Sequence, residues 1–157
     1  MGTDKPEVLA YIAGFLDGEG SIMLMNRRQR HKTKSWSCRV SIANTDRPIL
    51  EWIQSLYGGS IGLAKSLNPL HKDCWHWRLD SKGAVEFLRL VRPYLRLKAM
   101  RADVVFEYAS TITSVGRGGV TDEIEQARKK LHEKLVLLNA RGRRTPPCPL
   151  PAEADTA

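Results

Sequence analysis

One short stretch, residues 10–21 with the sequence AYIAGFLDGEGS, constrains the fold of this chain more than any other part of it. Small residues recur there with the spacing i, i+3, i+4 and i+7, which places them on one side of a helix. Glycine inside a helix costs roughly 1 kcal/mol against alanine, so a packing reason is expected. A helix face without bulky side chains allows a second helix to approach closely. We therefore predict a helix–helix interface formed by Ala10, Ala13, Gly14 and Asp17.

The predicted helix, residues 6–17, ends in two acids that alternate with glycines, Asp17 to Gly20. These glycines are expected to supply special backbone that stops the helix. The carboxyl end of a helix is the negative end of its dipole and favours basic side chains, so two acids there need a compensating charge. A divalent cation such as Mg²⁺, bound by the Glu19 carboxylate and the Gly18 carbonyl, would provide it, because hard cations take oxygen ligands.

Residues 12–20, with the sequence IAGFLDGEG, resemble the signature of the LAGLIDADG homing endonucleases. The resemblance implies that Glu19 is the metal-binding catalytic acid, with Mg²⁺ or Mn²⁺ as the cofactor, and that Gly18 offers its carbonyl. Asp17 would be a structural acid at the helix end. Taken alone, the same residues also fit an ordinary helix with a small packing face and an acidic turn.

Length and charge narrow the classes of protein to consider. A chain of 157 residues suits one domain with a substantial core. Its net charge of +8 predicts attraction to a polyanion, nucleic acid first and a membrane surface second. No apolar run approaches the roughly 20 residues of a membrane span, and the N-terminus has no secretory pattern. We expect an intracellular protein, in an organelle or a bacterial cytoplasm, with a domain over residues 1–142 and a disordered proline-rich tail over 143–157.

The cysteines predict neither a disulfide framework nor a structural zinc site. The cysteines Cys38, Cys74 and Cys148 are odd in number and widely spaced, which is not a disulfide framework. Residues 71–76 (HKDCWH) contain two histidines and a cysteine, but no second cluster completes a tetrahedral zinc site.

Two hairpins are predicted, with strands at residues 21–29 and 35–44 and at residues 60–66 and 74–80. Apolar and polar side chains alternate along them, so one face is apolar and the other polar and basic. A two-stranded ribbon fits the major groove of DNA, although a solvated sheet face would show the same alternation. The candidate DNA contacts are Ser21, Met23, Met25, Arg27, Gln29, Arg30, Lys32, Lys34, Ser35, Ser37, Arg39, Ser41, Lys65, His76 and Arg78.

The order of the predicted elements extends the resemblance. Further helices are expected at about residues 48–57, 82–94, 99–113 and 121–140, which with the hairpins makes the αββαββα plan of the homing endonucleases followed by C-terminal helices. The fold class is therefore α+β, with a saddle-shaped antiparallel sheet. By resemblance, Lys98 is an active-site lysine, Asn44 holds the place of a Gln or Asn near the scissile phosphate, and Arg47 has a neighbouring basic role.

A single copy of the motif implies half of an active site. We expect a homodimer that packs through the small helix face and makes a metal-dependent double-strand break in DNA at a long, near-palindromic target. One alternative is a non-cleaving DNA- or RNA-binding protein of the same fold, such as an intron maturase or a transcriptional regulator. Another, a basic RNA-binding or ribosome-associated module, leaves the acidic turn unexplained.

Overall fold

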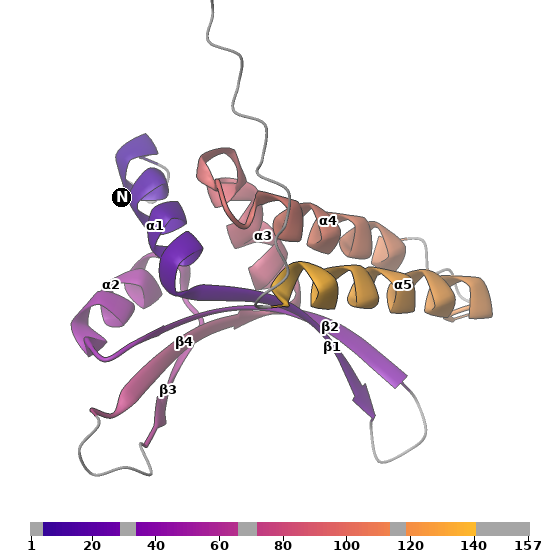
Figure 1. Ribbon diagram of the computed structural model, residues 1–157, viewed down its shortest axis with the longest axis horizontal. Helices are drawn as coiled ribbons and strands as arrows, with labels where there is room; N and C mark the ends of the chain where they lie inside the picture. The colour runs from indigo at the N-terminus through magenta and orange to yellow at the C-terminus, as the bar shows by residue number, and fades with distance from the viewer. Residues whose placement is uncertain (1–4, 29–33, 66–71, 114–118, 141–157) are drawn as a thin grey trace, which may run out of the picture.

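The computed structural model describes residues 5–28, 34–65, 72–113 and 119–140. Within these ranges a helix precedes two hairpins that are separated by a second helix, and the remaining helices follow (Figure 1). The elements are α1 (Pro6–Glu19), β1 (Gly20–Arg28), β2 (Lys34–Asn44), α2 (Arg47–Tyr57), β3 (Ser60–Ala64), β4 (Cys74–Asp80), α3 (Ser81–Val91), the 3₁₀ helix η1 (Arg92–Tyr94), α4 (Ala99–Thr113) and α5 (Asp122–Asn139). The predicted αββαββα order and α+β class are confirmed.

The strands form one antiparallel sheet in the order β1-β2-β4-β3, and the sheet arches beneath the helices (Figure 1). Pairing joins Ser21 to Ser41 and Ser41 to Arg78, which places all three on the same face of the sheet in one row across it. The saddle shape predicted from the two hairpins is thus present, with its hollow side turned away from the helices.

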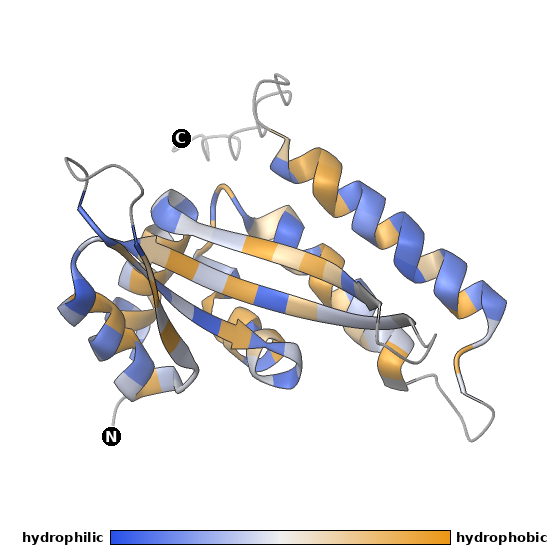
Figure 2. Cartoon of the chain, turned by 90° about the horizontal axis from the view of Figure 1, so that it is seen from below, coloured by the Kyte–Doolittle hydropathy of each residue, from blue (hydrophilic) through white to orange (hydrophobic). Residues whose placement is uncertain are grey.

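The predicted alternation along the strands decides which face is buried. Ile22, Val40, Ile42 and Trp77 have no exposed surface and pack beneath the helices. Figure 2, which looks onto the other side of the sheet, shows hydrophilic and hydrophobic residues alternating along the strands. Because successive side chains point to opposite faces, the same pattern that builds the core leaves a polar surface under the arch.

Helix α1 extends two residues beyond its predicted end and includes Glu19. The expected left-handed glycines are not found there, since Gly20 has φ −94° and Gly18 is not among the residues with positive φ. Gly20 is required for a different reason: a Cβ atom would lie 2.7 Å from the carbonyl oxygen of Leu16. The glycine therefore permits a close approach where the chain turns directly from α1 into β1.

The small face of α1 divides into a buried and an exposed half. Ala13 has no exposed surface and Asp17 is 8% exposed, because other elements of the same chain cover them. Ala10 and Gly14 are exposed, and Gly18, one turn further, continues their row. The predicted interface is therefore corrected: Ala13 and Asp17 belong to the interior of the chain, and the exposed row is Ala10, Gly14 and Gly18.

The other helix ends follow local chemistry. Gly58, with φ 71°, ends α2 as its position in the sequence predicts. The helix predicted over residues 82–94 instead changes to the 3₁₀ helix η1 at Arg92. Pro93 explains the change, because proline removes a backbone donor and its ring crowds the preceding turn.

Helix α4 has the predicted bounds, and the Thr121 side chain caps α5 by accepting from the N–H of Ile124.

Helix α5 runs along the edge strand β1 and covers part of its backbone. The Nδ1 atom of His132 lies 2.9 Å from the carbonyl oxygen of Leu24, and the amide of Asn139 donates to the carbonyl of Ile22 at 2.9 Å. Side chains that occupy edge carbonyls prevent another strand from pairing there. These contacts hold the C-terminal helices against the start of β1, next to the end of α1.

Candidate functional site

Asp17 ties the end of α1 to the segment before α4. Its carboxylate accepts hydrogen bonds from the backbone N–H groups of Arg96, Leu97 and Lys98, at 2.7, 3.0 and 2.9 Å. Hydrogen bonds to a charged group contribute more than neutral ones, about 1.5–3 kcal/mol each. The peptide dipoles therefore stabilise the negative charge of Asp17, and the backbone at Lys98 is held beside the last turn of α1.

The side chain of Lys98 turns back to the same helix end. Its ammonium group donates to the backbone carbonyl of Asp17. Burial lowers the pKa of Lys98, and the nearby charge of Arg101 adds to this, whereas the charges of Asp17 and Glu19 favour the protonated form. A cation thus lies at the negative end of the α1 dipole, where the acidic sequence had required one.

Glu19 is the last residue of α1, and its carboxylate is exposed. Among the residues that the structure describes, none donates a hydrogen bond to the carbonyl of Gly18, whereas the carbonyl of Asp17 is taken by Lys98. A carboxylate and an open carbonyl are hard oxygen donors, and they fit Mg²⁺, which keeps several waters and needs few protein ligands. In the described ranges no cluster of three or more His, Cys, Asp or Glu side chains could hold a metal ion.

Asn44 and Arg47 are engaged in local contacts of their own. The side-chain oxygen of Asn44 accepts from the N–H of Asp46 at 2.8 Å. Arg47 donates to Glu51 at 2.6 Å, and its guanidinium lies 4.5 Å from the ring centroid of Trp75. Within the described part of the chain, no hydrogen bond or ion pair joins either residue to Glu19 or Lys98. The pairing of Gly20 with Ile42 nevertheless sets the end of β2, and with it Asn44, near the end of α1.

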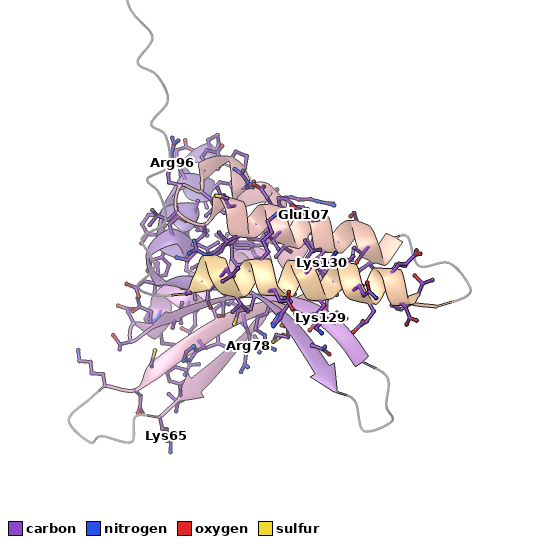
Figure 3. All side chains as sticks on the ribbon, turned by 45° about the vertical axis from the view of Figure 1, so that its right-hand side comes forward. Lys65, Arg78, Arg96, Glu107, Lys129 and Lys130 are labelled. Carbon is purple, nitrogen blue, oxygen red and sulfur yellow. The ribbon has the colours of Figure 1, made fainter. Side chains whose placement is uncertain are left out.

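The predicted nucleic-acid contacts that are described lie on the face of the sheet opposite the helices. Figure 3 shows Lys65 and Arg78 on that side and Arg96 on the helical side. Ser21 and Ser41 are joined there by a hydrogen bond of 2.9 Å. Partly exposed residues of this face are Met23, Met25, Ser35, Ser37, Arg39, His76 and Arg78, and Lys65 is exposed. Outside the described part lie Gln29, Arg30, Lys32 and the side chains of Arg27 and Lys34.

The sequence interpretation missed the role of Asp80. Its carboxylate accepts two hydrogen bonds from Arg39, at 2.6 and 3.0 Å. Alternation places both residues on the outer face, but only the register of β2 against β4 makes them direct partners. The two backbone groups that bind Asp17 at Arg96 and Leu97 were also missed, because backbone donors leave no mark in a sequence.

A sequence model described as LAGLIDADG endonuclease matches residues 12–100, which include the second half of α1, the whole sheet, Glu19 and Lys98. The chain belongs to the LAGLIDADG endonuclease family. The match contains both the motif and residues 96–98, whose backbone N–H groups bind Asp17. Both parts of the candidate site in this chain therefore lie within the family domain. No curated protein matches the sequence significantly.

Solved structures share the fold of this LAGLIDADG endonuclease. The homing endonuclease I-CvuI, solved with the I-CreI target DNA and Mg, is 21% identical with a TM-score of 0.68, covering 87% of this chain and 85% of that one. The archaeal intron-encoded homing endonuclease I-Vdi141I, solved with DNA, is 22% identical with a TM-score of 0.69 and covers 87% of each chain. The homing endonuclease I-TnaI is 20% identical with a TM-score of 0.61, covering 83% of this chain and 95% of that one.

Proposed function

We propose that this LAGLIDADG endonuclease acts as a homodimer that makes a Mg²⁺-dependent double-strand break at a long, near-palindromic DNA sequence. The observation that carries the proposal is the double attachment of Lys98 to Asp17, which holds an ammonium group at the carboxyl end of α1, the helix whose last residue is Glu19. A cation and a metal-binding acid at the same helix end suit the cleavage of a phosphodiester, where negative charge develops on the phosphate oxygens.

The polar side of the arched sheet is the proposed DNA surface. It carries Lys65, Arg78, His76 and the serines of the central row, and the chain has a net charge of +8. I-CvuI and I-Vdi141I, which share the fold, were both solved with DNA. None of the described helices combines the length and the apolar character that a membrane span needs.

In the proposed mechanism, Glu19 and the carbonyl of Gly18 hold the metal, for which Mn²⁺ is an alternative to Mg²⁺. When bound, the metal lowers the pKa of a water and stabilises charge on the phosphate. Lys98 donates from its ammonium group toward the same phosphate charge. Asn44 orients the attacking water through its amide group, whose oxygen also accepts from Asp46. Arg47 takes part through its Nη atoms, because its hydrogen bond to Glu51 uses Nε.

A second copy of the chain is the proposed partner of α1. A Cβ atom added at Gly14 or Gly18 would meet nothing within 4 Å, so no contact inside this chain requires glycine at either position. Glycine in a helix nevertheless costs roughly 1 kcal/mol against alanine. A partner helix packed along the row of Ala10, Gly14 and Gly18 explains that cost. It also brings a second Glu19 to the axis, one for each strand of the DNA.

Cleavage of a randomised plasmid library tests the proposal. Incubation with Mg²⁺ and sequencing of the cut ends should yield a single near-palindromic target. Glu19→Gln keeps the size of the side chain and removes a metal ligand, so cutting should be lost while DNA binding in Ca²⁺ persists. If Glu19→Gln cuts at the rate of the unmutated protein, the catalytic assignment is wrong. If no version cuts but all bind one sequence, the chain is a DNA-binding protein of this fold.

A further inference from the structure

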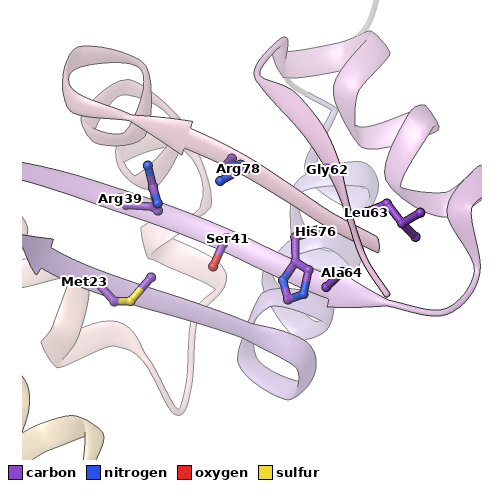
Figure 4. Close-up of a pocket in the computed structure, with 8 residues that line it drawn as sticks. All are labelled: Met23, Arg39, Ser41, Gly62, Leu63, Ala64, His76 and Arg78. Carbon is purple, nitrogen blue, oxygen red and sulfur yellow. The ribbon is translucent and has the colours of Figure 1, made fainter. Parts of the chain in front are cut away.

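A hollow of about 330 Å³ lies in the middle of the proposed DNA surface (Figure 4). Arg39 and Ser41 on β2, His76 and Arg78 on β4, and Gly62 on β3 contribute to its lining. The register places Ser41 beside Arg78 and Gly62 beside His76, and Met23 on β1 also lines the space, so all four strands contribute to the hollow. Two guanidinium groups therefore face the same space, and they differ in what they already bind.

Arg39 forms an ion pair with Asp80 of the same chain. Its Nε atom donates to one oxygen of Asp80 and its Nη2 atom to the other, at 2.6 and 3.0 Å. These hydrogen bonds raise the pKa of Arg39, and the two charges compensate each other. A bidentate pair of this kind fixes both side chains and uses two of the three guanidinium nitrogens.

Arg78 has no such partner. Its Nε atom is buried and makes no hydrogen bond, and among the described residues nothing forms an ion pair with its guanidinium. Buried polar atoms without a partner are rare in native structures, and each needs an explanation. A ligand that enters the hollow and binds the guanidinium would offset the cost of holding Arg78 there.

Gly62 makes room for Arg78. A Cβ atom at position 62 would lie 2.6 Å from the Nη2 atom of Arg78, closer than real contacts allow. Glycine weakens a strand because it loses more backbone entropy on folding and has no side chain to pack. It often marks a site where another group approaches the backbone closely. The missing side chain leaves a slot on β3 in which the end of Arg78 lies.

The chemistry of the hollow selects one base. An arginine offers donors only, and the major-groove edge of guanine offers two acceptors, N7 and O6, in the spacing that a guanidinium matches. Resting on the function proposed above, we propose that Arg78 reads a guanine in each half of the target and that Gly62 positions it. The central row of the sheet, rather than its rim, is the place for a base contact.

The test is a selection of binding sites from randomised DNA in Ca²⁺, in which the base preference at every position is measured. Arg78→Lys keeps the positive charge and loses the fork geometry. It should reduce the preference for guanine at one position of each half-site by about 5- to 150-fold and leave the other positions unchanged. Gly62→Ala should change the preference at the same position, because it displaces the Arg78 head without removing it.

A matched control makes the same change away from this face. Arg89→Lys replaces an exposed arginine of α3, on the helical side of the sheet, and leaves the net charge unchanged, so all base preferences should be retained. A guanine preference that falls equally in both variants, or that is kept in Arg78→Lys, would overturn the inference. Weaker binding to every sequence with unchanged preferences in Arg78→Lys would mean a phosphate contact, which also overturns it. If the unmutated protein selects no sequence at all, the proposed function itself fails.

Discussion

Lys98 is joined to Asp17 twice, once through its backbone N–H and the carboxylate of Asp17, and once through its ammonium group and the carbonyl of Asp17. The two residues are 81 positions apart in the chain. The attachment makes Asp17, which is not expected to touch metal or DNA, the residue that positions Lys98. The two acids of the motif, separated by Gly18, thus have separate roles: Asp17 points inward as an anchor, and Glu19 points outward as a candidate metal ligand.

The alkaline pH dependence of cleavage should depend on Lys98. Burial lowers its pKa below the ordinary 10.5, so the ammonium form required for charge stabilisation is lost as the pH rises through that lowered value. The single-turnover cleavage rate should therefore fall on the alkaline side. Lys98→Arg keeps its charge to higher pH and should shift the fall upward, whereas Lys98→Ala should cut about 10²-fold more slowly at neutral pH. An unshifted fall in Lys98→Arg would assign it to another group.

Asp17→Asn should loosen the anchor. An asparagine offers one acceptor oxygen in place of two and turns an N–H group toward backbone donors, so part of the set made by Arg96, Leu97 and Lys98 is lost. We expect the free energy of unfolding to fall by about 1.5–3 kcal/mol in urea denaturation, with cleavage reduced more than DNA affinity. Asp46→Asn is the control, since the Asp46 side chain makes no capping hydrogen bond. Equal effects of the two substitutions would contradict the anchor.

Gly14→Leu should weaken the homodimer without harming the chain. The position is open within the chain, so added methylenes would clash only with a partner helix, at a cost of about 1–3 kcal/mol. Sedimentation should show the unmutated protein at twice the chain mass of 17.7 kDa and the variant shifted toward the single chain. Ala127→Leu, at an exposed position of α5, is the control. Ala13→Leu should instead destabilise the fold, because Ala13 is buried.

DNA binding should weaken steeply with salt. Each phosphate contact contributes about −0.9 to the slope of log K against log salt concentration, and the hairpins carry many lysines and arginines. Lys65→Ala should make the slope less negative by about 0.9 if Lys65 contacts a phosphate. Arg89→Ala, at an exposed position of α3 on the helical side, should leave the slope unchanged. Binding that does not depend on salt would argue against the assigned DNA surface.

Local patterns were sufficient to predict much of this fold. The alternation of apolar residues around Ile22, Val40 and Trp77 identified the buried face of each strand, since the side-chain period of a strand is two wherever it lies. Glycines such as Gly58 marked helix ends, and residues 12–20 indicated the family. Each of these features depends on neighbours in the chain, which a sequence displays directly.

Tertiary structure decided the rest, because it concerns residues that are distant in the chain. By sequence alone, Ala10, Ala13, Gly14 and Asp17 were equivalent members of one helix face, and only the packing of other elements against α1 made Ala13 and Asp17 interior. The register of β2 against β4 paired Arg39 with Asp80, whereas the buried Nε atom of Arg78 has no hydrogen-bond partner among the described residues. Residue types thus determined which groups the chain possesses, whereas the contacts between distant segments determined which of those groups remain free to bind something else.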